Sequence, residues 1–137
     1  MENFIFNIPT IAYVGKGQIS NLGLGIKQFG GSKVLLAYGG GSIKTNGIYD
    51  AVINEFDKAG IEFVEISGIK PNPPIEDVYE GIRLYKENSW DFIVAVGGGS
   101  VIDGVKFMTG AFHYEGDTYE VLQRKEGCVF TKALPFG

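Results

Sequence analysis

Short, nearly continuous apolar stretches alternate along the chain with segments whose apolar residues recur at helical spacing. The continuous stretches, residues 33–38, 61–66 and 91–96, predict buried strands. The segments that follow them predict amphipathic helices, because their apolar residues fall on one helical face. Those residues are Ile48, Tyr49, Val52, Ile53 and Phe56, then Ile75, Val78, Tyr79, Ile82 and Tyr85, and finally Val101, Val105, Met108 and Phe112. The alternation predicts an α/β fold with a Rossmann-like parallel sheet and helices on both faces.

Weaker patterns predict the remaining elements. Residues 4–14 are expected to form two short extended pieces, and residues 20–29 a serine-capped helix that two internal glycines weaken. A short helix is expected over residues 118–123, and the start of another strand over residues 132–136. Gly60 follows the first long helix at a position where a left-handed glycine commonly ends one.

Right-handed crossovers between parallel strands restrict the order of the sheet. We expect the strand at 61–66 to lie outside the strand at 33–38, and the strand at 91–96 to lie on its other side. Strand order then reverses between the strands at 33–38 and 91–96. Ligands of open α/β sheets bind at such a switch point, outside the carboxyl ends of the strands.

The tetrapeptide Gly-Gly-Gly-Ser follows two of these strands. The first glycine turn is Gly39, Gly40, Gly41 and Ser42, and the second glycine turn is Gly97, Gly98, Gly99 and Ser100. Glycine lets a ligand approach the backbone closely, and a helix start offers free N–H groups to an anion. Either turn alone could be only a tight connection, since neither has the spacing of the standard dinucleotide fingerprint or of the P-loop. Two turns at one sheet edge predict a ligand with more than one phosphate.

Composition restricts the class of protein. The 137 residues carry a net charge of −4, which argues against a nucleic-acid partner, and 45% are hydrophobic, enough for the core of about one domain. The apolar runs fall short of the roughly 20 residues that span a bilayer, so no membrane partner is expected. The single cysteine, Cys128, excludes an internal disulfide and fits a reducing compartment. We therefore expect a cytoplasmic protein.

Few side chains carry a catalytic signal. Asp103 and Lys106 lie three residues apart early in the helix after the second glycine turn, either as a surface ion pair or near the ligand. His113, the only histidine, is expected on the surface at the end of that helix, and one histidine cannot build a metal site. Cys128 lacks a paired histidine and is expected to be buried or half-buried. We therefore expect no catalytic residue and no metal ligand in this chain.

Longer motifs add a resemblance to a known family. AVGGGSVIDGVK after a strand, the PNPP connection before it and the opening NFIFNIPTIAYVGKG together resemble the iron-containing alcohol dehydrogenases. Within that family, YGGGSIKTNGIYD is similar to the butanol-dehydrogenase-like, aldehyde reductase branch. The resemblance extends over essentially the whole chain, in matching order.

The resemblance implies that residues 1–137 form the N-terminal dinucleotide-binding domain of an oxidoreductase acting on a small alcohol or aldehyde. A C-terminal helical domain, absent from this chain, would hold a divalent metal (iron or zinc) on one aspartate and three histidines. The cofactor would lie between the domains, with its pyrophosphate on the second glycine turn and its adenosine ribose at the first. Asp103 would lie near the nicotinamide end and Asn72 beside the adenosine half. A homodimer or self-association is also implied.

Cofactor choice depends on the first glycine turn. Enzymes that choose NAD commonly place a carboxylate at the end of such a strand, and none follows residues 33–38. Open backbone, the Ser42 hydroxyl and the nearby Lys44 could instead accept a 2′-phosphate. We therefore expect NADP to be preferred over NAD.

Two other functions stay open. One is a stand-alone nucleotide-binding module without catalysis, and the other is a relative such as a glycerol dehydrogenase or dehydroquinate synthase. An apolar patch where the helical domain would dock favours the cofactor domain of an oxidoreductase, whereas a polar surface there favours the module. In either case we expect the isolated chain to be inactive, because Lewis-acid activation is worth several kcal/mol.

Overall fold

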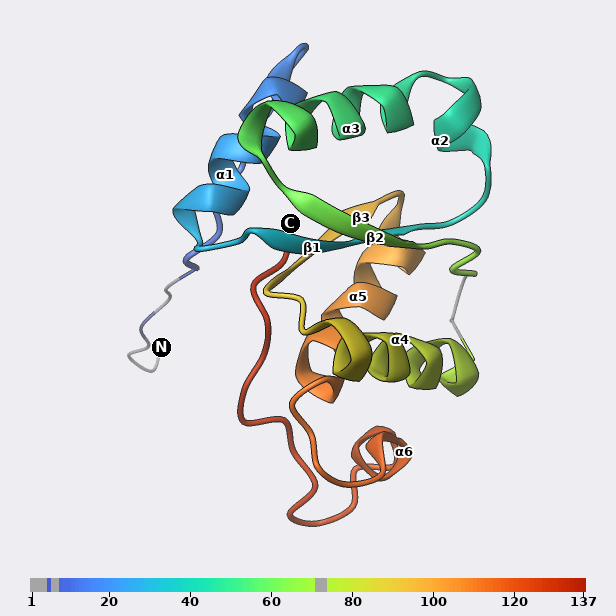
Figure 1. Ribbon diagram of the computed structural model, residues 1–137. Coiled ribbons are helices and arrows are strands. Elements are labelled where there is room, and N and C mark those ends of the chain that lie inside the picture. Colours follow the sequence, from blue (N-terminus) through green and yellow to red (C-terminus); the bar gives the residue numbers. More distant parts are fainter. Residues whose placement is uncertain (1–4, 6–7, 71–73) are drawn as a thin grey trace.

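The sheet in the computed structural model consists of three parallel strands among the described residues, which are 5, 8–70 and 74–137. The strands are β1 Lys33–Tyr38, β2 Glu62–Ile66 and β3 Phe92–Val96, in the order β2-β1-β3 (Figure 1). Leu36 of β1 is the partner of Glu65 in β2, and Tyr38 is the partner of Val96 in β3. The predicted strand order is confirmed, and the switch point lies between β1 and β3.

Helices cover both faces of the sheet. On one face lie α1 Leu22–Gln28 and α3 Ile48–Ala59, and on the other lie α4 Ile75–Asn88 and α5 Gly99–Ala111 (Figure 1). The predicted Rossmann-like α/β fold is therefore confirmed. Each helix among the described residues is too short or too polar to span a bilayer.

The central strand β1 explains why the molecule has two hydrophobic cores. All of its residues from Val34 onward are buried. Because side chains alternate across a strand, three of them pack into the core beneath α1 and α3, and the other two pack into the core beneath α4 and α5. The first set is Val34, Leu36 and Tyr38, and the second is Leu35 and Ala37. A strand buried on both faces requires this continuous apolar run.

Two helix ends follow signals that are visible in the sequence. Gly60 has a φ of 61° and ends α3 in the predicted left-handed conformation. The short helix predicted over residues 118–123 is α6 Thr118–Leu122. Asp117 caps it, because its carboxylate accepts a hydrogen bond from the Tyr119 N–H at 2.9 Å.

The N-terminal region differs from the prediction. Residues 8–14 have no regular secondary structure and lie exposed, while residues 4, 6 and 7 fall outside the described residues. The helix predicted over residues 20–29 is α1 Leu22–Gln28, but a 3-10 turn, η1 Gln18–Asn21, precedes it. The Ser20 hydroxyl donates to the Gly17 carbonyl oxygen at 3.0 Å instead of capping a helix, and this contact stabilises the tighter turn.

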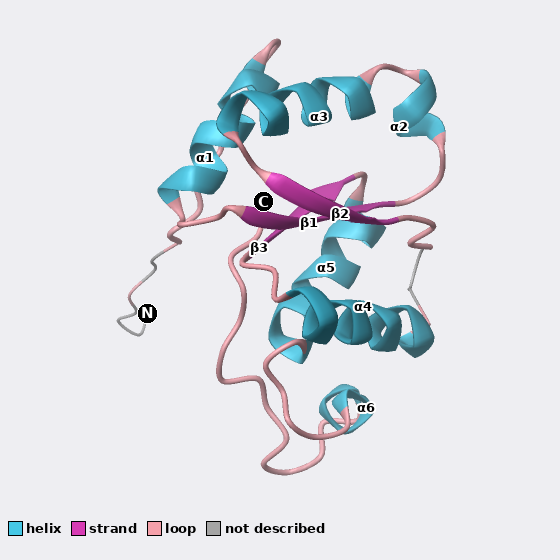
Figure 2. Cartoon of the chain, viewed as in Figure 1, coloured by secondary structure: helices cyan, strands magenta, loops and turns pink. Residues whose placement is uncertain are grey.

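The last residues of the chain pair with the free edge of β3. Phe136 forms a parallel bridge with Ile93, whose N–H donates to the Pro135 carbonyl oxygen at 3.1 Å. The Gly137 N–H donates back to the Ile93 carbonyl oxygen at 3.0 Å. Of the residues 132–136, which were predicted to begin a strand, only the last, Phe136, therefore forms a bridge to the sheet. Figure 2 shows the chain between α5 and this bridge as mostly loop, interrupted by α6.

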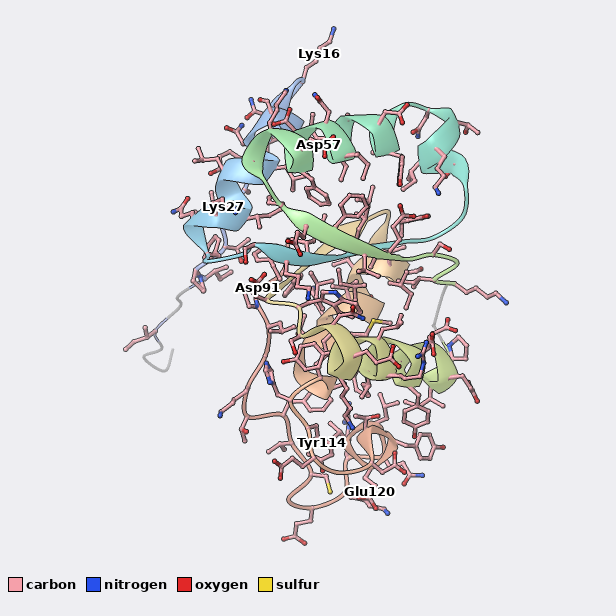
Figure 3. The ribbon with its side chains drawn as sticks, in the orientation of Figure 1. Lys16, Lys27, Asp57, Asp91, Tyr114 and Glu120 are labelled. Carbon is pink, nitrogen blue, oxygen red and sulfur yellow. The ribbon has the colours of Figure 1, made fainter. Side chains whose placement is uncertain are left out.

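Asp91 joins the start of β3 to the chain just before β1. Its carboxylate accepts hydrogen bonds from the Ser32 N–H at 2.9 Å, the Ser32 hydroxyl at 2.7 Å and the Lys33 N–H at 2.9 Å. Partial burial alone would raise the pKa of Asp91, but these hydrogen bonds outweigh it and lower that pKa. Asp91 thus links the amino ends of two neighbouring strands (Figure 3).

Candidate functional site

The two glycine turns leave neighbouring strands at the same edge of the sheet. The first follows β1 and the second follows β3, and the last residues of these strands, Tyr38 and Val96, are partners in the parallel register. Because the carboxyl ends of parallel strands meet at one edge, the two turns lie next to each other at the switch point. The predicted juxtaposition of the turns is confirmed, whereas their role in holding a ligand stays a prediction.

Val101 of α5 packs against both turns. A Cβ atom on Gly97 would come within 2.7 Å of Val101 Cγ2, which is too close for any larger residue. A Cβ atom on Gly39 would lie 3.5 Å from the same Val101 atom. One buried side chain therefore lies beside the first glycine of each turn.

The central glycines of both turns face open space. A Cβ atom built on any of them would have no heavy atom within 4 Å, and all are exposed: Gly40, Gly41, Gly98 and Gly99. Their backbones are therefore accessible to a ligand, which the absence of side chains allows to approach closely. Ser42 is exposed and Ser100 is half-buried beside them.

The two turns lead into helices of different length. The second leads directly into α5, which has 13 residues and Gly98 as its N-cap. The Gly98 carbonyl oxygen accepts hydrogen bonds from the N–H groups of Val101 and Ile102, while the earliest N–H groups of a helix have no helical acceptors. The first turn leads only into α2 Ser42–Thr45, a single turn of four residues. A helix was expected after each turn, but only the second turn is followed directly by a long one. After the first turn, Gly47 at φ 80° separates the short α2 from α3.

Two further residues were predicted to contact a cofactor. Asn72 lies outside the described residues. The Asp103 side chain, in the second turn of α5, is 78% exposed and its carboxylate lies 4.0 Å from the Lys106 ammonium. A surface pair at this distance contributes little to stability. Asp103 therefore stays accessible on the outer face of α5.

A polar cluster that sequence patterns did not predict lies beside the first glycine turn. Glu65 of β2 accepts a hydrogen bond from the Tyr38 hydroxyl at 2.6 Å and another from the Tyr49 hydroxyl. The Lys44 ammonium lies 3.6 Å from the same carboxylate and 4.6 Å from the centre of the Tyr49 ring. We call these four residues, which come from β1, α2, α3 and β2, the Glu65 cluster.

The charges of the Glu65 cluster support one another. Burial alone would raise the pKa of Glu65, but the hydrogen bonds from Tyr38 and Tyr49, together with the charge of Lys44, lower it. The Tyr38 hydroxyl raises the pKa of Lys44 most, burial opposes it, and the Glu65 carboxylate adds a smaller increase, so that the pKa is raised. At neutral pH the cluster therefore holds a carboxylate beside an ammonium group.

The Glu65 cluster supplies a carboxylate that the sequence did not lead us to expect beside the first glycine turn. No carboxylate stands directly after β1 in the sequence, yet the fold brings the Glu65 carboxylate of β2 to this position. The available signal was that Glu65 is the one charged residue in the stretch 63–66. A carboxylate in such a half-buried strand needs hydrogen-bonding partners, although the sequence does not say which.

The described side chains do not fit a resident metal ion. Among the described residues, no three histidine, cysteine, aspartate or glutamate side chains gather to bind one. His113 is exposed after the end of α5, and its ring lies edge-on to Tyr85 with the ring centres 5.7 Å apart. Cys128 is half-buried, as expected, and is a free thiol.

An apolar hollow of about 740 Å³ lies away from the glycine turns. The N-terminal segment, α1 and the last residues of the chain form its walls, which include Pro9, Tyr13, Leu22, Phe29 and Phe136. Phe92, at the start of β3, also lines it, so the hollow is near the amino end of this strand. Contiguous apolar surface of this kind commonly marks an interaction site.

Comparison with known proteins gives consistent matches over this chain. The profile of a family described as iron-containing alcohol dehydrogenase matches residues 9–136. Over 98% of its length, the chain is 44% identical to NADH-dependent butanol dehydrogenase A of Clostridium acetobutylicum and covers 34% of that protein. Over its whole length, it is 38% identical to the NADPH-dependent aldehyde reductase YqhD of Escherichia coli and covers 35% of it.

The fold agrees with these matches. A crystal structure of NADH-dependent butanol dehydrogenase A from Thermotoga maritima matches with a TM-score of 0.92 at 45% identity, covering 99% of this chain and 34% of that one. The chain thus spans about a third of the length of the relatives that it matches. Because the family profile covers nearly all of its residues, the chain belongs to the iron-containing alcohol dehydrogenase family.

Proposed function

We propose that this chain is the cofactor-binding part of a metal-dependent, NAD(P)-linked alcohol dehydrogenase or aldehyde reductase. The reaction is hydride transfer between the nicotinamide ring and a primary alcohol or aldehyde. The observation that carries the proposal is the pair of open glycine turns at neighbouring strand ends in a chain of this family. Relatives named for NADH and for NADPH support a nicotinamide dinucleotide as the ligand class.

The second glycine turn is the proposed pyrophosphate site. Backbone N–H groups at the start of α5 would donate to the phosphate oxygens, and the helix dipole would stabilise their negative charge. Gly98 and Gly99 leave open space beside the backbone that phosphates could occupy. The first glycine turn would contact the adenosine ribose, and we assign Asn72 to the adenosine half and Asp103 to the nicotinamide end.

We place the metal outside this chain, since the described residues do not gather its ligands. Iron or zinc would be bound by a C-terminal helical domain, so residues 1–137 form the dinucleotide-binding domain and catalyse no turnover alone. The apolar hollow lies near the amino end of β3, away from the glycine turns, so it does not decide between this assignment and a stand-alone binding module. We also propose a homodimer or self-association in the cytoplasm, without membrane partners. The net charge of −4 supports the absence of a nucleic-acid partner.

Preference for the 2′-phosphate is the finer part of the proposal. The open backbone and the exposed Ser42 hydroxyl of the first glycine turn support NADP over NAD. Lys44, the third expected contributor, is engaged by Glu65. Relatives named for either cofactor exist, so the preference for NADP stays a prediction.

Isothermal titration of the 137-residue chain with NADH and NADPH, without metal, tests the proposal. Both cofactors should bind the wild-type chain. Gly98→Asp should retain the fold, because Gly98 has an ordinary φ of −86° and aspartate is a favourable N-cap. The new carboxylate would face the pyrophosphate, so affinity for both cofactors should fall at least about tenfold, or 1.4 kcal/mol.

Gln123→Asp is the matched control, because it adds the same charge to an exposed residue after α6. It should leave both affinities unchanged. The proposed site is wrong if neither cofactor binds the wild-type chain, or if Gly98→Asp binds both as well as the wild type does.

A further inference from the structure

The Glu65 cluster contains the cation nearest in sequence to the first glycine turn. Lys44 lies two residues after Ser42, and its backbone N–H donates to the Gly41 carbonyl oxygen at 3.0 Å. Its ammonium group is directed to the Glu65 carboxylate at 3.6 Å and over the Tyr49 ring at 4.6 Å. A residue anchored to the turn by its backbone is therefore held by its side chain to β2 and α3.

The position of the cluster relative to a dinucleotide follows from the strand order. In Rossmann-like sheets the pyrophosphate lies at the turn after one strand, and the adenosine ribose lies at the carboxyl end of the next strand outward. With the pyrophosphate on the turn after β3, that next strand is β1. Tyr38 ends β1, and its hydroxyl donates a hydrogen bond to Glu65. The cluster therefore lies beside the proposed position of the ribose.

The Glu65 carboxylate is fixed in place more firmly than a surface carboxylate. Two tyrosine hydroxyls donate to it, one from β1 and one from α3. Its side chain is 28% exposed, compared with 49% for Lys44, so the lysine is the more mobile partner and the glutamate sets its position. The negative charge also cancels the positive charge that a 2′-phosphate would meet here.

We propose that Glu65 is a specificity-determining positioning residue that holds Lys44 away from the 2′-phosphate and so limits discrimination in favour of NADPH over NADH. The inference rests on the proposed function, because it assumes that a dinucleotide binds at the two glycine turns. With Glu65 in place, the charges of the cluster beside the proposed ribose position nearly cancel. Loss of the Glu65 charge would release one ammonium group beside the first glycine turn.

The test compares a single and a double variant of the 137-residue chain, with the ratio of the NADH and NADPH dissociation constants as the readout. Glu65→Gln keeps an oxygen that can accept a tyrosine hydrogen bond but removes the charge. The ratio should shift toward NADPH by about tenfold, as expected for one new charge-assisted contact to phosphate. In Glu65→Gln combined with Lys44→Met, the ratio should return to within about twofold of wild type, since both charges are then absent.

Glu62→Gln is the matched control, because it makes the same change at the exposed opposite end of β2. It should leave the ratio unchanged. The inference is overturned if both cofactors bind Glu65→Gln with the wild-type ratio, or if the gain persists in the double variant. Binding of neither cofactor to the wild-type chain would instead refute the proposed function, and the inference with it.

A measurement on the unsubstituted chain guards against misfolding of Glu65→Gln. Acetylation of Lys44 by acetic anhydride, followed by mass spectrometry, should proceed at the same rate with NADPH bound as with NADH bound. Selective protection of Lys44 by NADPH would mean that the ammonium already reaches the 2′-phosphate. That result would overturn the inference without any substitution.

Discussion

Asp91→Asn tests how the amino ends of β1 and β3 are held together. The Asp91 carboxylate binds the Ser32 N–H, the Ser32 hydroxyl and the Lys33 N–H within 2.9 Å, across 59 positions of sequence in the case of Ser32. Asparagine has nearly the same shape, and its single oxygen can still accept a backbone N–H. Its amide nitrogen cannot accept a hydrogen bond, and the negative charge is lost.

These contacts determine how much unfolding free energy Asp91→Asn should lose. A hydrogen bond to a charged group contributes about 1.5–3 kcal/mol, and at least one is lost while the others lose their charge assistance. We expect Asp91→Asn to lower the free energy of unfolding by about 2 kcal/mol at neutral pH. For a chain of this length, such a loss corresponds to a fall in Tm of about 7 °C.

The assay is urea and thermal unfolding followed by circular dichroism, with Asp57→Asn as the control. Asp57 is an exposed residue on α3 (Figure 3), and its substitution should change stability by less than about 0.5 kcal/mol. Because the fold lowers the pKa of Asp91, its stabilisation is present above the usual aspartate range and is lost as pH falls through the lowered pKa. The difference between wild type and Asp91→Asn should therefore shrink in acid. A loss of unfolding free energy below about 0.5 kcal/mol in Asp91→Asn, or a loss that is unchanged in acid, would show that the Asp91 charge does not stabilise the fold in this way.

Two further predictions concern packing. Gly110→Ala would place a Cβ atom against the Phe130 ring and should cost about 1–3 kcal/mol in urea unfolding, whereas Gly40→Ala, with open space around it, should change stability little. Equal effects of the two substitutions would show that Phe130 does not pack on α5. Phe56→Ala would empty a fully buried position that contacts Phe63 and should lower the free energy of unfolding by about 3–5 kcal/mol. A loss below about 1 kcal/mol in the same assay would contradict the burial of Phe56 in this core.

Several elements could be predicted from the sequence because their signals are local. The apolar run at residues 33–38 requires burial on both faces, and β1 is buried in this way. Gly60 ends α3 because a left-handed residue is needed there. The strand order could also be predicted, since short right-handed connections leave few alternatives.

The interruptions of these elements were harder to predict. The break between α2 and α3 depends on the positive φ of Gly47, which glycine permits but does not require. The 3-10 turn before α1 depends on the Ser20 hydroxyl bonding to a carbonyl three residues back instead of capping a helix. Such alternatives differ by about 1 kcal/mol, and tertiary contacts decide between them.

In the candidate site, too, local signals could be read from the sequence and tertiary contacts could not. The sequence alone predicts that two open glycine turns meet at one sheet edge, because repeated strand-turn patterns and strand order are local or topological properties. The contact in which Glu65 holds Lys44 against Tyr38 and Tyr49 beside the first turn is visible only in the folded structure. The physical reason is that this contact depends on the register between β1 and β2 and on the packing of α3. Neither leaves a periodic signal at the residues concerned.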